Sequence, residues 1–171
     1  MSEPRPIVPG ALSSSGAAAS SGVRKASSAD APAVAAAIEQ LLIELGGSRP
    51  SRAELEAAAR ELIDDREAGA VLVAATGGEI VGVLAVSWQQ AIHVPGRYGT
   101  IQDLWVLPAW RSRAIGHDLI EALCELARER GISRLEVGLP KESYERIGAT
   151  EAFYRVNGFS HLGPRMRRLL P

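Results

Sequence analysis

The sequence predicts a mixed α/β domain with a central sheet of six to seven strands and about four helices. Apolar residues recur at helical spacing, as they do over 33–45, and this spacing predicts amphipathic helices. Two runs rich in β-branched residues flank Gly77-Gly78, which predicts a β-hairpin. A strand, a helix and another strand follow one another over 100–139 and indicate a central β-α-β unit.

The first third of the chain predicts one strand and two helices. Residues 23–28 can form a short strand, and 33–45 carry an apolar helical stripe that Gly46-Gly47 ends. Ser51 and Glu54 have the spacing of a capping box, in which each residue satisfies a free amide of the other, and this pair begins the second helix.

The middle third predicts three strands. The strands of the hairpin are expected at 70–75 and 80–88. Residues 89–99 are polar and contain proline and glycine, so we expect them to form an irregular connection. The third strand covers 100–107, and Pro108 ends it because proline cannot donate a ladder hydrogen bond.

The last third predicts two helices and three strands. One helix begins at Gly116, presents a single apolar face, runs to Arg130 and is closed by Gly131. The remaining elements are a strand at 135–139, a short helix at 150–156 that Gly158 ends, and closing strands at 159–162 and 165–170.

Residues 1–22 differ in composition from the rest of the chain. They are mostly Ser, Ala, Gly and Pro, so they bury too little apolar surface to offset the entropy of ordering. They also lack the positive segment and the continuous apolar stretch of a secretory signal. We therefore expect a disordered tail over 1–22, a single domain over 23–171 and a cytoplasmic location.

The composition excludes several classes of protein. Among 171 residues, 19 basic and 20 acidic side chains give a net charge of −1, so no bulk attraction to nucleic acid or an anionic membrane is expected. Cys124 is the one cysteine, which excludes a disulfide framework and a four-cysteine zinc site. The three histidines, His93, His117 and His161, lack metal-ligand spacing, so we expect no metal.

The most informative segment joins the third strand to the helix at Gly116. The first amides of a helix have no intrahelical partner and lie at the positive end of its dipole. Amides at Arg113, Ala114, Gly116 and His117 could converge on a phosphate, with charge added by Arg111 and Arg113. The alternative is an ordinary loop with solvated arginines. The glycine patterns of a P-loop and of a dinucleotide-binding fold are both absent.

This segment resembles motif A of the GNAT-type N-acetyltransferases, whose pattern is Arg/Gln-x-x-Gly-x-Gly/Ala after a strand. The match is 111–116, following Val106-Leu107-Pro108, and Ala114 stands where the family has its first glycine. The resemblance implies a GNAT fold and a site for the pyrophosphate of coenzyme A. It assigns this pyrophosphate to Arg111, Ser112, Arg113, Ala114, Ile115, Gly116 and His117, and the pantetheine arm to the backbone of Leu104, Trp105 and Val106. The methyl of Ala114 is expected to weaken or shift this binding.

A second segment, 149–159, resembles the A-x-x-F-Y-x-x-x-G-F segment of the same family. The resemblance implies that Tyr154 protonates the departing thiolate of coenzyme A. A tyrosine is a suitable donor, because its ordinary pKa of about 10 keeps it protonated at neutral pH. The alternative is that Tyr154 anchors an amphipathic helix at the surface.

The residue that accepts the proton of the amine stays open. Glu136 is one candidate, because some family members place a base at this position, and Asp103 is another. The neighbouring Gln102 cannot take a proton. Either carboxylate could instead be a solvated or ion-paired strand residue, with a water relay as the base.

The expected function is transfer of an acetyl group from acetyl-CoA to a primary amine of a small molecule, directly within a ternary complex. Residues 30–67 contain nine acidic and four basic side chains, which would suit a cationic amine. The alternatives are a protein lysine or N-terminal acetyltransferase and a non-catalytic acyl-CoA-binding sensor. No nucleic acid or membrane partner is expected, and exposed sheet edges could pair two copies as a homodimer.

Overall fold

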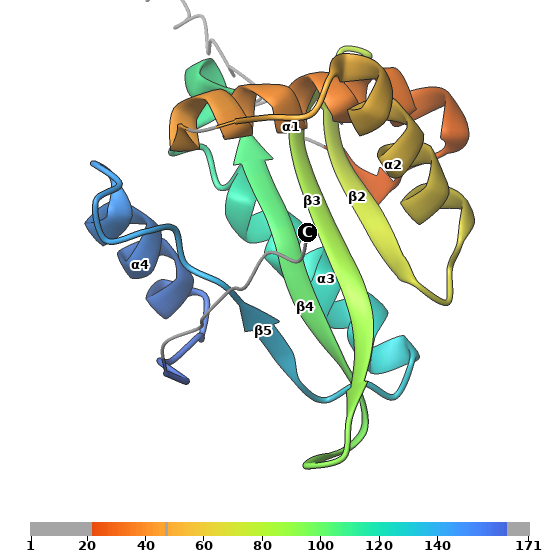
Figure 1. The fold of residues 1–171 in the computed structure, drawn as a ribbon, viewed down its shortest axis with the longest axis vertical. Helices are drawn as coiled ribbons and strands as arrows, with labels where there is room; N and C mark the ends of the chain where they lie inside the picture. The colour runs from red at the N-terminus through yellow and green to blue at the C-terminus, as the bar shows by residue number, and fades with distance from the viewer. Residues whose placement is uncertain (1–21, 47, 164–171) are drawn as a thin grey trace, which may run out of the picture.

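The computed structural model describes residues 22–46 and 48–163 and contains one twisted sheet with helices on both faces (Figure 1). The sheet order is β1-β2-β3-β4-β5, with every neighbouring pair antiparallel except β4 and β5, which are parallel. The strands are β1 (Gly22–Lys25), β2 (Gly69–Thr76), β3 (Glu79–Ala91), β4 (Val94–Val106) and β5 (Leu135–Val137).

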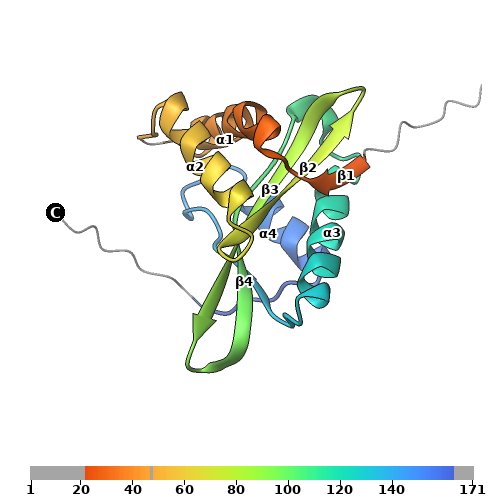
Figure 2. The same ribbon diagram turned by 90° about the vertical axis from the view of Figure 1, so that its right-hand side faces the viewer.

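In the described part of the chain, four α-helices cover the two faces of the sheet. They are α1 (Ala31–Leu45), α2 (Arg52–Asp64), α3 (Ile115–Glu129) and α4 (Ile147–Val156), with short 3₁₀ turns at Ser28–Asp30 and Pro108–Trp110. Helices α1 and α2 lie on one face, and α3 and α4 lie on the other (Figure 2). The predicted capping box of α2 is confirmed, since the Ser51 amide donates to Glu54 Oε2 at 2.8 Å.

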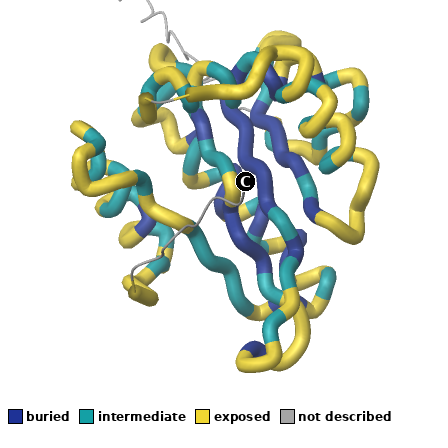
Figure 3. The backbone as a smooth tube through the Cα atoms, in the orientation of Figure 1, coloured by how far each residue is buried: buried dark blue, intermediate teal, exposed yellow. Residues whose placement is uncertain are grey.

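Two apolar cores hold these layers together, one on each face of the sheet. Many of the buried residues lie along the central strands (Figure 3). The larger core joins Leu84 and Val86 of β3 to Leu119 and Leu123 of α3, all buried. The smaller core packs β2, β3 and Trp105 against α1. The alternation of side chains along each strand therefore feeds both cores, which fixes β4 between the two helix layers.

The predicted connection over 89–99 is wrong, because β3 and β4 continue through it as one long hairpin. Gln89 pairs with Tyr98 and Gln90 pairs with Arg97, beyond the part of the sheet that the helices cover. This end of the hairpin has little apolar surface to bury, so its residues lack the alternation by which a strand is predicted.

The structure describes five strands, so the expected six to seven are not found in the described residues. The predicted strand at 159–162 is wrong: the Phe159 amide donates to the Tyr154 carbonyl at 3.0 Å and so closes the end of α4. The predicted strand at 165–170 lies outside the described residues. So does the predicted tail over 1–22, except for Gly22, which begins β1. None of the helices within 22–46 and 48–163 is long and apolar enough to cross a membrane.

Candidate active site

No described strand pairs with the outer edge of β4 beyond Ile101. Strand β5 pairs with β4 only at Gly99, Thr100 and Ile101 and then diverges. The register of β4 against β3 shifts at the same place, because Ile101 pairs with Val86 while Asp103 pairs with Ala85. The extra residue is a β-bulge, which bends the strand where its neighbour leaves it.

Along this edge, the backbone N–H and C=O groups that point away from β3 belong to every second residue. The Leu107 amide donates to the Val81 carbonyl of β3 at 2.9 Å, so Trp105, two residues earlier, also turns its backbone toward β3. Leu104 and Val106 therefore face the open edge. The Val106 carbonyl there accepts a hydrogen bond from Arg111 Nε at 2.9 Å.

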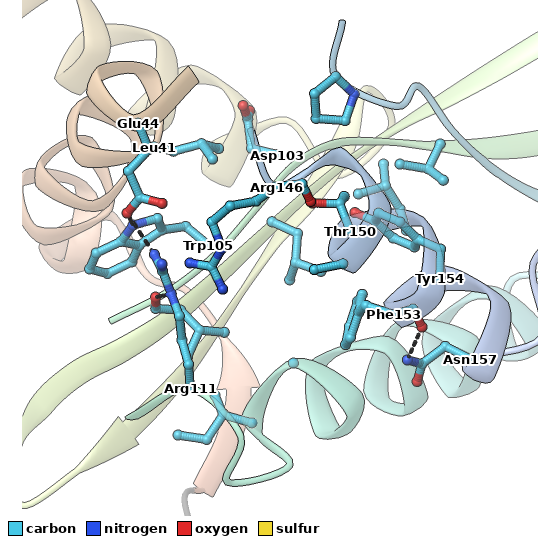
Figure 4. A pocket seen from close by; sticks show the side chains of 18 of the residues that line it. Leu41, Glu44, Asp103, Trp105, Arg111, Arg146, Thr150, Phe153, Tyr154 and Asn157 are labelled. Carbon is cyan, nitrogen blue, oxygen red and sulfur yellow. Dashed lines mark hydrogen bonds and ion pairs between the residues drawn. The ribbon is translucent and has the colours of Figure 1, made fainter. Parts of the chain in front are cut away.

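A cavity of about 600 Å³ borders this edge, between the end of α1, the loop before α3, and α4 (Figure 4). It brings together most of the predicted site residues: Asp103, Leu104, Trp105, Val106, Arg111, Ser112, Ala114, Ile115, Gly116, His117 and Tyr154. Arg113 and Glu136 do not line it.

The loop before α3 has an unusual backbone. Ser112 and Ala114 have φ of +62° and +63°, in the left-handed region that favours glycine. Ala114 thus has the conformation for which the family's glycine is suited, and it directly precedes the first turn of α3, whose amides lack intrahelical partners. Arg113 turns aside, and its guanidinium stacks 4.9 Å from the Trp110 ring centroid.

Gly116 is restricted by its neighbours in α4. A Cβ atom at Gly116 would lie 3.1 Å from two ring atoms of Phe153, which is tighter than ordinary contact. The side chain of His117 also joins α4, with Nδ1 at 2.8 Å from Asn157 Oδ1. The start of α3 is therefore packed directly against the C-terminal half of α4.

Arg111 is held by partners within the protein. Its Nη2 donates to Glu44 Oε1 of α1 at 2.6 Å, and the Trp105 indole Nε1 donates to the same oxygen at 3.2 Å. Both charged side chains are about three-quarters buried. One carboxylate thus connects α1, β4 and the loop.

Tyr154 lies deep in the same site, with only 7% of its surface exposed. Its ring packs edge-to-face between Phe153 and Phe159, with centroids 5.2 and 5.4 Å away. Burial raises the pKa of the Tyr154 hydroxyl, and the negative charge of Asp103 raises it further. The hydroxyl therefore remains a proton donor in neutral and mildly alkaline solution.

The two candidate bases lie in different surroundings. Asp103 is half-buried, lines the cavity and has a pKa raised by burial. Glu136 accepts a hydrogen bond from Arg134 Nε at 2.8 Å and lies outside the cavity lining. In the structure Glu136 is thus an ion-paired strand residue, which is the alternative to a catalytic base that the sequence left open.

The acidic residues of the first two helices contribute little to the cavity. Among the acids of 30–67, Glu44 is the one that lines it, and Glu44 is paired with Arg111. Others form surface ion pairs, such as Glu56 with Arg60. The predicted attraction of a cationic amine by these helices thus has little support in the geometry.

Several lining residues were not singled out from the sequence, among them Glu44, Arg146, Thr150 and Asn157. A signal existed for two of them. Arg146 and Thr150 precede Tyr154 by eight and four residues, so the three share one face of a helix. Within the described part of the chain, no three His, Cys, Asp or Glu side chains gather in a way that could hold a metal ion.

Comparison with known proteins identifies the family. The model of the Acetyltransferase (GNAT) family matches residues 36–159, so the chain belongs to this family. This result agrees with the resemblance of the loop and of α4 to the family's two motifs. Members of the family use acetyl-CoA as the acetyl donor.

Individual relatives are more distant. The chain is 36% identical over 93 residues to an IAA acetyltransferase of Azospirillum brasilense, which covers 54% of this chain and 56% of the relative. It is 30% identical over 83 residues to an aminoalkylphosphonate N-acetyltransferase of Salmonella typhimurium, a match that covers 47% of this chain and 54% of the relative. The chain thus spans about half the length of these curated relatives.

Solved structures show the same fold. An acetyltransferase predicted in Clostridium acetobutylicum, solved with acetyl-CoA, has a TM-score of 0.70. The two proteins are 18% identical, and the likeness covers 86% of this chain and 95% of the other. At this identity the comparison establishes the fold.

Proposed function

We propose that this protein is an N-acetyltransferase that moves an acetyl group from acetyl-CoA to a primary amine of a small molecule, by direct transfer in a ternary complex. The observation that carries the proposal is the content of a single cavity. An open strand edge, the N-terminus of α3, a buried tyrosine and a carboxyl group that forms no ion pair with the described residues all border it.

The residues present fit an acyl-CoA donor. The open edge at Leu104 and Val106 offers backbone groups to the amides of a pantetheine arm, as a neighbouring strand would. The loop from Ser112 to His117, at the start of α3, offers amides to a pyrophosphate. The methyl of Ala114 is the one departure from the family pattern, and its left-handed backbone keeps the expected turn.

The reaction requires two proton transfers. The amine nitrogen attacks the thioester carbonyl carbon, a C–N bond forms, the C–S bond breaks, and the electron pair leaves on sulfur. We assign to Tyr154 the proton given to this sulfur, because its hydroxyl is protonated and lies in the cavity. The proton lost by the amine passes to a carboxylate, either directly or through water.

We assign the role of the base to Asp103, in preference to Glu136. Asp103 faces the cavity, and a carboxylate with a raised pKa binds a proton more strongly than an ordinary one. Glu136 forms an ion pair with Arg134 at 2.8 Å and does not line the cavity. The name of the aminoalkylphosphonate relative supports an amine as the acceptor.

The test is release of thiol from acetyl-CoA in the presence of a panel of small amines. We expect free coenzyme A to form faster than by hydrolysis with at least one amine, in equal amount to the acetylated product. Acetyl-CoA should also raise the melting temperature. A protein that is stabilised by acetyl-CoA but releases no thiol with any small amine or peptide would be a binding module, which contradicts the proposal.

A further inference from the structure

We propose that the acceptor carries an acidic group as well as its amine, and that Arg146 binds this group. The inference rests on the proposed function and specifies the substrate of the same cavity. The acceptor class is a short zwitterion, a primary amine joined through a few carbons to a carboxylate or a similar acid.

The first argument for this acceptor comes from the charged side chains that line the cavity. Four lining side chains belong to strongly acidic or basic residues: Glu44, Asp103, Arg111 and Arg146. Glu44 and Arg111 neutralise each other at 2.6 Å. None of the ion pairs among the described residues involves Asp103 or Arg146. The cavity therefore keeps one negative and one positive side chain for its ligands.

The second argument comes from the positions of Asp103 and Arg146. Asp103 and Tyr154 both line the cavity and carry the two proton transfers of the proposed reaction, so the two mark the reacting end. Arg146 immediately precedes α4 and is eight residues before Tyr154, which places the two backbones about 12 Å apart along the helix axis. The Arg146 side chain points toward Trp105 and Arg111 and away from Tyr154 (Figure 4), which leaves room for a short carbon chain between amine and acid.

The orientation of α4 separates the backbone of Arg146 from the amides at the start of α3, and Arg111, toward which its side chain points (Figure 4), is already paired with Glu44. Asn157, at the C-terminal end of α4, contacts His117 of the loop at 2.8 Å. Phe153 packs against Gly116 in the same region. The backbone of Arg146 is at the other end, about 16 Å from Asn157 along the axis. We therefore assign its charge to the acceptor and not to the pyrophosphate of the donor.

Charge balance favours the same class of acceptor. An ammonium beside Asp103 and an acid beside Arg146 would each replace water by an opposite charge within a partly buried site. A neutral acceptor of equal length would leave Arg146 without a partner. Hydrogen bonds to charged groups contribute enough to give about a ten- to hundredfold preference for the acid-bearing amine in kcat/KM.

The experiment compares a ladder of ω-amino acids of increasing length with the corresponding ω-amino amides, in which the acid is a neutral carboxamide. We expect the acid-to-amide ratio of kcat/KM to rise about ten- to hundredfold at the best length. Arg146→Gln should lower this ratio toward one, and Arg146→Lys should retain part of it. The KM for acetyl-CoA should not change in either variant. Arg155→Gln is the matched control, since Arg155 is on the same helix, outside the lining, and pairs with Glu151.

The outcomes separate the two proposals. Thiol release with amides and acids alike, with no preference at any length, would overturn the zwitterion and leave the acetyltransferase intact. A higher KM for acetyl-CoA in Arg146→Gln, with the acid-to-amide ratio unchanged, would place this arginine on the donor instead. No thiol release with any amine would refute the proposed function, and the inference with it.

Discussion

Glu44 Oε1, in the last turn of α1, accepts a hydrogen bond from Arg111 Nη2 at 2.6 Å. Because Arg111 also donates to the Val106 carbonyl, the end of α1 is connected to the open edge of β4 through one guanidinium. A planar arginine can serve both partners at once, whereas a lysine cannot. The end of α1 and the loop proposed for the donor are thus held in a fixed relation.

The first prediction concerns the strength of this connection. A double-mutant cycle with Glu44→Gln and Arg111→Gln should give a coupling of about 1 kcal/mol in the free energy of unfolding. The value is modest because each side chain keeps about a quarter of its surface exposed. The surface pair of Glu56 and Arg60 is the control, with an expected coupling of about 0.3–0.5 kcal/mol. Equal coupling in both cycles would show that the Glu44–Arg111 pair has no special role.

The second prediction concerns Ala114. An L-residue in the left-handed region costs about 1–2 kcal/mol relative to glycine, whereas glycine gains entropy in the unfolded chain. Ala114→Gly should therefore change the stability by less than about 1 kcal/mol and keep or improve the affinity for acetyl-CoA in calorimetry. Ala114→Val should weaken both, since a β-branched side chain tolerates this backbone poorly. Weaker binding by the glycine variant would contradict the argument.

The loop before α3 and Tyr154 could be singled out from the sequence because the patterns that mark them are local. Both depend on a few residues at fixed spacing next to a helix end, and the cavity brings these residues together. The capping box of Ser51 and Glu54 is local in the same sense, and the structure confirms it. Patterns of this kind need no knowledge of the tertiary fold.

The contact made by Glu44 could not be predicted because it comes from tertiary packing. Glu44 and Arg111 are 67 residues apart and meet only when α1 crosses the end of β4. The hairpin over 89–99 was missed for a related reason. Gly99 pairs with Trp88, whose ring leaves no room for a Cβ atom there, and this contact is not visible in a local pattern.

The third prediction concerns the effect of Asp103 on the stability of the fold. Burial raises the pKa of Asp103 above its value in the unfolded chain, so the folded state disfavours the charged form. This cost is absent while the carboxyl is protonated and grows as the pH rises through its folded pKa. Asp103→Asn should therefore raise the melting temperature at neutral pH, and the difference should narrow as the pH is lowered. A lower melting temperature at neutral pH would contradict the prediction.

The fourth prediction concerns catalysis by the same residue. Asp103→Asn should lower kcat/KM by about 10²–10⁴, since an amide cannot accept the proton of the amine. The matched variant Glu136→Gln, which loses a carboxylate outside the cavity, should keep activity close to that of the unmodified protein. The reverse result would return the role of the base to Glu136.

The last prediction concerns the proton given to sulfur. Tyr154→Phe removes one oxygen and keeps the ring between Phe153 and Phe159, so the fold and the affinity for acetyl-CoA should be retained. We expect kcat to fall by about 10²–10⁴. Because the pKa of Tyr154 is raised, the unmodified enzyme should keep its acid protonated up to at least about pH 10.

Acyl donors with different thiols separate an acid from a structural anchor. A more acidic thiol leaves without protonation, so the loss caused by Tyr154→Phe should shrink as the pKa of the leaving thiol falls. An anchoring tyrosine would give the same ratio of rates for every donor, because its effect would not depend on the leaving group. A constant ratio, or equal kcat for the two proteins, would therefore refute the role of Tyr154 and assign the proton to water or to another donor.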